Sequence, residues 1–156
     1  MYPDLYTLEL PGPGRLSIMA RPRGGDWLED EISALRRVGV ACLVSLLTPD
    51  EAEALELTEE ATLCRACGLR FLSLPIQDRD VPEAPRLLSA LLVKLGAEFD
   101  AGRHVVIHCR QGIGRASLVA ASLLVGRGYT LDQAFTCVAQ ARGRDVPDTD
   151  EQRAWV

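Results

Sequence analysis

The segment at residues 104–125 constrains this chain more than any other part of its sequence. A short apolar stretch leads into a loop with two glycines, and an unbroken apolar stretch typical of a helix follows. Gly112 and Gly114 permit a tight curl in which successive amide N–H groups converge on one point. Such a curl at a helix N-terminus binds anions and favours the thiolate of a cysteine placed there, as Cys109 is. The segment therefore predicts an oxyanion site with a nucleophile at its floor.

Strands and helices are predicted to alternate along the chain. Short apolar stretches bounded by turn residues predict strands at residues 5–10, 15–20, 40–47, 69–76 and 104–108. Helices are predicted at residues 26–38, 49–67, 86–101, 115–125 and 131–141, with a short last helix that starts near Asp148 or Thr149. Asp26, Thr48 and Thr130 each have the sequence context of a helix N-cap.

This alternation predicts an α/β fold with a central, mostly parallel sheet of four to five strands. Helices flank such a sheet on both faces. Ligands bind beyond the carboxyl ends of its strands, and the loop that carries Cys109 follows one such end. The order of the elements and the chemistry of the loop therefore agree.

Composition narrows the function classes. The length of 156 residues predicts a single domain over residues 1–156. A net charge of −5 argues against bulk attraction to nucleic acid or to an anionic membrane, so any phosphate binding must be local. Five cysteines are an odd number, and the first twenty residues lack the basic and apolar regions of a signal peptide. Reduced thiols in a cytoplasmic protein are the simplest interpretation.

The pattern Cys-x5-Arg, preceded by His108 and with Gly-x-Gly before Arg115, resembles the signature of a known enzyme family. That family is the cysteine-dependent protein tyrosine and dual-specificity phosphatases, and the small size resembles its atypical dual-specificity type. The resemblance implies a phosphate-binding loop (P-loop) between a strand and the central helix. It also implies hydrolysis of a phosphorylated protein or other phosphomonoester through a phosphocysteine intermediate, with no cofactor and no metal. It leaves open the oligomeric state and the preference for phosphotyrosine over phosphoserine and phosphothreonine.

The resemblance assigns roles within the loop. Cys109 would attack phosphorus, and Arg115 would hold two phosphate oxygens through its planar fork. His108 would lie behind the loop and bond backbone carbonyls or orient Cys109, or it would be a satisfied core histidine. The backbone amides that bind the phosphate would belong to Arg110, Gln111, Gly112, Ile113, Gly114 and Arg115.

A general acid is expected on a second loop, because the leaving oxygen needs a proton. Asp78 matches the aspartate of the family by its spacing after a strand and Pro75, and Asp80 is the alternative. Gln152 resembles the glutamine with which some family members hold the hydrolytic water, or it is a surface residue of a terminal helix.

One position departs from the family pattern. The family usually has Ser or Thr directly after the motif arginine, whereas this chain has Ala116, with Ser117 one residue later. The phosphatases of the regenerating liver type share this alanine and turn over slowly. We therefore expect hydrolysis of the intermediate to limit the rate.

Two other interpretations remain. The chain could be a phosphate-recognising binding module of the same fold, which Ala116 favours, or a sulfur-transfer or redox enzyme, which would not need Arg115. Phosphoinositide and RNA 5′-phosphate substrates also stay open. The pair Cys64-x-x-Cys67 is interpreted as a helical coincidence rather than a redox or zinc site, and Cys42 and Cys137 as core thiols.

Overall fold

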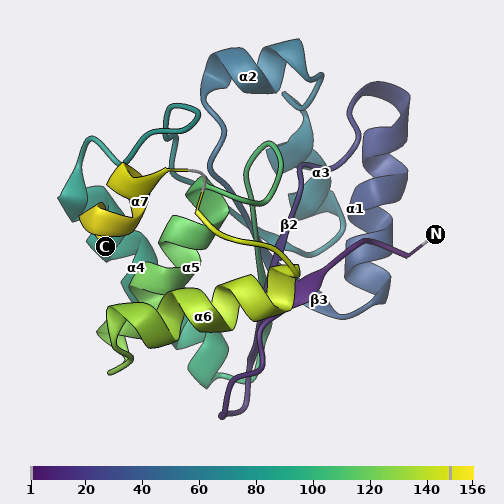
Figure 1. Cartoon of the computed structure of the whole chain (residues 1–156). Coiled ribbons are helices and arrows are strands. Elements are labelled where there is room, and N and C mark those ends of the chain that lie inside the picture. Colours follow the sequence, from purple (N-terminus) through teal and green to yellow (C-terminus); the bar gives the residue numbers. More distant parts are fainter. Residues whose placement is uncertain (1, 148) are drawn as a thin grey trace.

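The computed structural model describes residues 2–147 and 149–156. Five strands form one sheet in the order β1-β2-β5-β3-β4, in which β1 runs antiparallel to β2 and the other neighbours are parallel. The strands are β1 (Tyr6–Thr7), β2 (Arg15–Met19), β3 (Val40–Ser45), β4 (Arg70–Ser73) and β5 (His104–His108). The predicted α/β fold with a mostly parallel sheet is confirmed (Figure 1).

Seven α-helices and a 3₁₀ turn accompany the strands in the described residues. They are η1 (Gly25–Trp27), α1 (Leu28–Arg37), α2 (Pro49–Ala54), α3 (Glu60–Ala66), α4 (Pro85–Asp100), α5 (Arg115–Gly126), α6 (Leu131–Arg142) and α7 (Asp150–Trp155). Thr48, Thr130 and Thr149 each cap a helix with a reciprocal capping box. The predicted caps at Thr48 and Thr130 are confirmed, and so is the last helix at Thr149; its alternative start, Asp148, lies outside the described residues.

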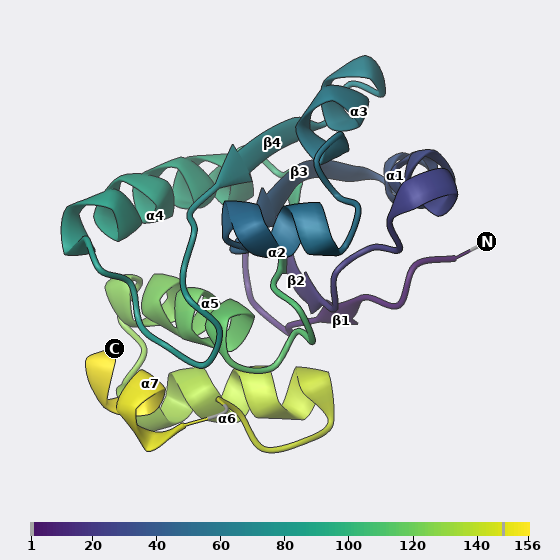
Figure 2. The same cartoon turned by 90° about the horizontal axis from the view of Figure 1, so that it is seen from above.

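Helices cover both faces of the sheet (Figure 2). Along β5, Val105 and Ile107 pack in one hydrophobic cluster with residues of α4, α5 and α6, whereas Val106 packs in a second cluster with residues of α1 and α3. This period of two places successive side chains on opposite faces. The central helix α5 is buried almost all round, as its continuous apolar sequence predicts.

Two helix predictions are wrong. Asp26 lies inside the turn η1, and α1 begins two residues later without a side-chain cap. The cause is Gly25, whose N–H bonds the carbonyl of Glu56 and whose φ of 59° is left-handed. The predicted helix 49–67 is two helices, because Glu56 also has a left-handed φ and the next residue, Leu57, turns into the core.

Two strands are shorter than predicted. Of residues 5–10 only Tyr6–Thr7 pair as a strand, and β4 ends at Ser73. Pro75 has no N–H and interrupts the ladder, although the flanking Leu74 and Ile76 still donate to the continuation of β3. Within the described residues, no helix combines the length and the apolar character needed to cross a membrane.

Candidate active site

The loop of residues 109–114 lies where β5 ends at the carboxyl edge of the sheet, and it leads directly into α5. The Cys109 side chain is 3% exposed. Gly112 takes a left-handed φ of 70°, and a Cβ there would lie 2.7 Å from the backbone of Met19, at the end of β2. The curl of the loop and its close approach to β2 therefore both require glycine at this position.

The loop turns its carbonyl groups outward. The N–H of Arg21 donates to the carbonyl of Arg110 over 3.2 Å. The guanidinium of Arg142 donates to the carbonyls of Gly112 and Gln111 over 3.1 and 3.3 Å. None of the N–H groups of residues 110–114 donates to an acceptor among the residues that the structure describes. Such a cluster of unpaired amides at a helix N-terminus is suited to bind an oxyanion.

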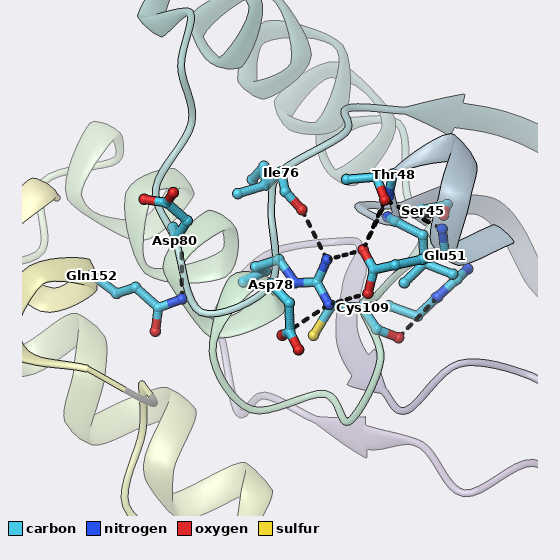
Figure 3. Close-up of polar contacts among 11 residues, drawn as sticks. Ser45, Thr48, Glu51, Ile76, Asp78, Asp80, Cys109 and Gln152 are labelled. Carbon is cyan, nitrogen blue, oxygen red and sulfur yellow. Dashed lines mark hydrogen bonds and ion pairs between the residues drawn. The ribbon is translucent and has the colours of Figure 1, made fainter. Parts of the chain in front are cut away.

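The Arg115 side chain is 1% exposed and makes four hydrogen bonds. Its Nη1 donates to Glu51 over 2.6 Å and to the carbonyl of Ile76 over 2.8 Å. Its Nη2 donates to the other oxygen of Glu51 over 3.0 Å and to Asp78 over 3.1 Å (Figure 3). Burial lowers the pKa of Arg115, but its bond to Glu51 and the nearby Cys109 and carboxylates raise it above the ordinary value.

Glu51 has two roles. It lies in the first turn of α2, where its carboxylate accepts a bond from the N–H of Thr48 and completes the capping box. The same carboxylate forms the two-pronged ion pair with Arg115. Burial works to raise the pKa of Glu51, but the hydrogen bonds from Arg115 and Thr48 outweigh burial and hold it below 4.5. Glu51 therefore fixes the arginine as a charged, oriented fork.

His108 lies behind Cys109 and is completely buried. Its Nδ1 is 3.2 Å from the carbonyl oxygen of Cys109, and its Nε2 is 2.7 Å from Oε2 of Glu60, itself a buried residue of α3. A carbonyl only accepts, so Nδ1 is the donor in its contact with Cys109. His108 therefore bonds a backbone carbonyl, as one interpretation of the sequence predicts, and Glu60 fixes the orientation of its ring.

The loop between β4 and α4 carries Asp78 and Asp80, and we call it the acid loop. It reaches the cavity beside Cys109. Cys109, Asp78, Arg79, Gln111 and Gly114 line one cavity of about 120 Å³. Asp78 is the carboxylate that faces Cys109 in Figure 3, and its side chain is 52% exposed.

Asp80 has a different environment. Its carboxylate accepts the N–H of Val81 over 2.8 Å, and it does not line the cavity. The arrangement favours Asp78 over Asp80 as the acid, and the choice remains a prediction.

Gln152 is buried and joins α7 to the acid loop. Its Nε2 donates to the carbonyl of Asp80 over 3.1 Å, and its Oε1 accepts the N–H of Thr149 over 3.2 Å. The surface interpretation of Gln152 is wrong, because this side chain is 0% exposed. Its role in holding a water remains a prediction.

The other positions singled out in the sequence lie apart from the cavity lining. Ala116 is buried in the first turn of α5, and the buried Ser117 hydroxyl has no partner among the described residues. Cys42 is a core thiol whose pKa burial raises to about 12. Cys137 packs against the main hydrophobic cluster but is only partly buried and lines a groove beside α6, so it lies at the edge of the core.

Cys64 and Cys67 both lie at the C-terminal end of α3. Cys64 is buried in α3 and its pKa is raised to about 12, first of all by burial, while Cys67 is the C-cap of that helix. Over residues 2–147 and 149–156, no group of three or more His, Cys, Asp or Glu side chains is arranged to hold a metal ion.

Three residues of the site were not identified in the sequence as part of it. Glu51 has the signal of a capping box, which predicts a helix start and not an ion pair 64 residues away. Glu60 and Arg142 give no local signal, because their partners lie 48 and 30 residues away and only the fold brings them together.

Solved structures with this fold cover nearly the whole chain. Kinase-associated phosphatase (KAP), with its catalytic-site cysteine substituted by serine, matches with a TM-score of 0.88 and 20% identity, over 99% of this chain and 92% of that chain. The active form of Tk-PTP matches with a TM-score of 0.79 and 26% identity, over 99% and 94%. TpbA of P. aeruginosa in complex with phosphotyrosine matches with a TM-score of 0.61 and 21% identity, over 95% and 86%.

The fold together with the cysteine loop is that of the small protein tyrosine and dual-specificity phosphatases. Human dual specificity protein phosphatase 2 is 31% identical over 80 residues, which are 51% of this chain and 26% of that protein. The chain thus spans about a quarter of the length of this relative. It belongs to the family of the DSP-PTPase phosphatase domain of Swiss Army Knife proteins (PTP-SAK), whose model matches residues 7–152.

Proposed function

We propose that this protein hydrolyses phosphomonoesters of proteins, phosphotyrosine and also phosphoserine or phosphothreonine, through a phosphocysteine intermediate on Cys109. The observation that carries the proposal is the set of N–H groups of residues 110–114 around that cysteine, which have no acceptor among the described residues. Residues 1–156 would act as one domain of a cytoplasmic enzyme.

Phosphate binding would use the loop amides and Arg115. The Nε–H of Arg115 has no partner among the described residues, and its Nη2 is shared between Glu51 and Asp78. A phosphate that replaces Asp78 on Nη2 and bonds Nε would be gripped by two parallel donors. Asp78 is exposed enough to leave, whereas Glu51 would stay and hold the guanidinium. Displaced from Arg115, Asp78 would be ready to meet the leaving oxygen.

The first chemical step would transfer the phosphoryl group to the enzyme. The Sγ thiolate of Cys109 attacks phosphorus, the bond to the ester oxygen breaks, and protonated Asp78 gives its proton to that oxygen. The loop amides and Arg115 hold the three equatorial oxygens as charge spreads over them.

The second step would release phosphate. A water molecule attacks phosphorus, Asp78 takes a proton from it, and the P–S bond breaks to restore the thiolate. Ala116 has no hydroxyl with which to stabilise the departing sulfur, and this favours slow hydrolysis of the intermediate.

A burst experiment with p-nitrophenyl phosphate tests the mechanism. We expect a rapid release of about one equivalent of nitrophenol per enzyme, followed by slower steady turnover. Vanadate should inhibit, and metal chelators should leave the rate unchanged. Turnover without a burst at saturating substrate would count against a rate-limiting second step, and sensitivity to chelators would count against the mechanism itself.

The second candidate function is a binding module that holds a phosphate and hardly turns it over. Ala116 and the ion pair between Asp78 and Arg115 favour it. A burst of one equivalent without subsequent turnover, or binding without any burst, would favour the module.

A further inference from the structure

Helix α4 is apolar on two opposite sides. The residues of its inner side are buried in the core and are Leu88, Leu91, Leu95 and Phe99. The outer side also carries large apolar side chains, because Val93 is 74% exposed and Leu87 is 59% exposed. Two of the four large apolar side chains that the described residues expose therefore lie on this one helix. Figure 2 shows α4 at the outside of the molecule, with α5 beside it.

The outer sides of α1 and α6 differ from that of α4, because they are polar. The exposed residues of α1 are Glu29, Asp30, Arg36 and Arg37. Those of α6 are Asp132, Gln133, Thr136 and Gln140. A helix side that faces only water usually carries charged and polar residues, whereas exposed apolar side chains gathered on one helix indicate a contact surface. The outer side of α4 therefore has the character of an interface.

A groove of about 480 Å³ lies between the outer side of α4 and the end of α5. Its lining is mostly apolar or small and includes Leu92, Val93, Gly96, Ala97, Leu123 and Gly126. Glycine and alanine shorten the distance at which two helices can pack, because it depends on the side chains at the contact. The groove is therefore suited to receive the apolar face of another helix.

The sequence of the outer side of α4 is nearly symmetric about Val93. Small residues stand three and four positions to either side of it: Ser89, Ala90, Gly96 and Ala97. Arg86 stands seven positions before Val93, and Asp100 stands seven positions after it. Residues three, four and seven positions apart share one face of a helix. This face therefore has an apolar centre between two ends of opposite charge, which matches a reversed copy of itself.

We propose that α4 docks on α4 of a second copy of this chain, as an antiparallel pair with two-fold symmetry. An axis beside Val93 makes the contact self-complementary and brings Arg86 of each copy opposite Asp100 of the other. Among the described residues, no carboxylate forms an ion pair with Arg86. Asp100 pairs with Arg127 over 2.8 Å but stays 60% exposed, so its carboxylate can accept a second guanidinium.

The proposed contact is small and leaves both active sites open. A helix of the length of α4 spans about 24 Å, and a contact of this extent lies at the lower end of specific interfaces. We therefore expect a dimer that dissociates in the micromolar range. Because α4 leads away from the acid loop, an antiparallel pair places the two cysteine loops at opposite ends of the dimer. The inference does not depend on the proposed function.

Sedimentation equilibrium of the unmodified chain tests the dimer. The measured mass should rise with concentration from 17.0 kDa toward twice that value. Val93→Glu places two like charges beside the two-fold axis and should weaken dimerisation by about 100-fold or more. Because Val93 is exposed in the monomer, the variant should keep its unfolding free energy and its turnover of p-nitrophenyl phosphate. Tyr2→Glu adds the same charge at another exposed apolar position, and this matched control should dimerise like the unmodified chain.

An exchange of charges tests the antiparallel arrangement. Arg86→Glu and Asp100→Arg should each weaken the dimer by about 5-fold or more, because each variant sets like charges opposite one another at both ends of the contact. An equimolar mixture of the two variants should restore dimerisation, since every end then joins opposite charges. A parallel pair of helices would show no such rescue, because it sets each position beside itself.

A mass of 17.0 kDa at every concentration would overturn the proposal, and so would a dimer that Val93→Glu leaves intact. Failure of the mixed variants to dimerise would reject the antiparallel pairing of α4. A monomer that binds anionic lipid vesicles, and loses this binding on Val93→Glu, would assign the surface to a membrane instead of a second copy. Turnover of p-nitrophenyl phosphate is measured separately, so the proposed function can fail while the dimer stands, and the reverse.

Discussion

The cysteine loop and the acid loop meet at one cavity. Buried contacts hold the cysteine loop in place, whereas the acid loop is largely exposed. Arg115 is fixed by Glu51 and by the Ile76 carbonyl, and His108 is fixed by Glu60. Asp78, in contrast, is 52% exposed. The comparison suggests a rigid phosphate cradle and a proton donor that exchanges partners during the cycle.

The largest effect is expected from a substitution in the cysteine loop. Cys109→Ser should lower kcat by about 10⁴-fold or more, because a hydroxyl in this loop is a far poorer nucleophile than a thiolate. Oxyanion binding should persist, since the loop amides and Arg115 remain. Steady-state kinetics and vanadate titration measure the two effects. Cys137→Ser, at a partly buried thiol outside the cavity, is the matched control and should keep full activity. Residual activity of Cys109→Ser above a few per cent would reject the assignment.

A substitution in the acid loop should lower kcat less, by a factor that depends on the leaving group of the substrate. Asp78→Asn should slow phenyl phosphate by about 10²-fold and p-nitrophenyl phosphate much less, because a good leaving group needs little help from an acid. The same change removes the carboxylate that competes for Arg115, so phosphate should bind more tightly.

Asp80→Asn is the control for this experiment. Its carboxylate accepts the Val81 N–H and stays outside the cavity, so the variant should retain activity with both substrates. If Asp80→Asn instead shows the leaving-group dependence, the two aspartates exchange roles.

A third variant tests how much the ion pair between Glu51 and Arg115 stabilises the fold. Glu51→Gln should cost roughly 1–2 kcal/mol of unfolding free energy at neutral pH, as expected for one charge-assisted bond lost from a mostly buried pair. Since the folded pKa of Glu51 is held below 4.5, its contribution is complete above about pH 4.5 and is lost as the pH falls through the lower folded pKa. Urea unfolding at pH 7 and pH 3 measures this difference. Glu53→Gln, on the exposed side of α2, is the control and should leave the unfolding free energy unchanged at both pH values. If the stability difference between Glu51→Gln and the unmodified chain grew on acidification, the role given to Glu51 would be contradicted.

The sequence predicted the parts of the site that are local. Five residues separate Cys109 from Arg115, and the glycines among them predict the tight curl of the loop, for which Gly112 takes the left-handed φ. The strand order could be predicted only as far as parallel pairing, because the position of β5 between β2 and β3 is a property of the whole sheet. The antiparallel β1 lies within the strand predicted at residues 5–10, but nothing in the sequence marks its direction or limits it to two residues.

The parts that the sequence did not predict depend on long-range contacts. Glu51 and Glu60 are separated from their partners by 64 and 48 residues, and nothing near them in the chain marks either one as buried. The break after α2 has the same origin, because Leu57 is drawn into the core and forces Glu56 into a left-handed turn. Local propensity favours a continuous helix there, and packing overrides it.

The smallest expected effect tests how the exposed loop is held. Gln152→Glu keeps an acceptor for the Thr149 N–H, so the capping box of α7 survives, but it replaces the donor that bonds the Asp80 carbonyl. Loss of one hydrogen bond should lower kcat about threefold with phenyl phosphate and leave p-nitrophenyl phosphate unchanged, if Gln152 acts by positioning the acid loop.

The alternative role of Gln152 gives a different kinetic pattern. If its amide holds the water that hydrolyses the phosphocysteine, Gln152→Glu should slow turnover equally for both aryl phosphates and leave the burst amplitude at one equivalent. Asp80→Asn serves again as the control, because it keeps the carbonyl that Gln152 bonds. Pre-steady-state traces for the two substrates therefore distinguish a Gln152 that positions the acid loop from a Gln152 that holds the hydrolytic water.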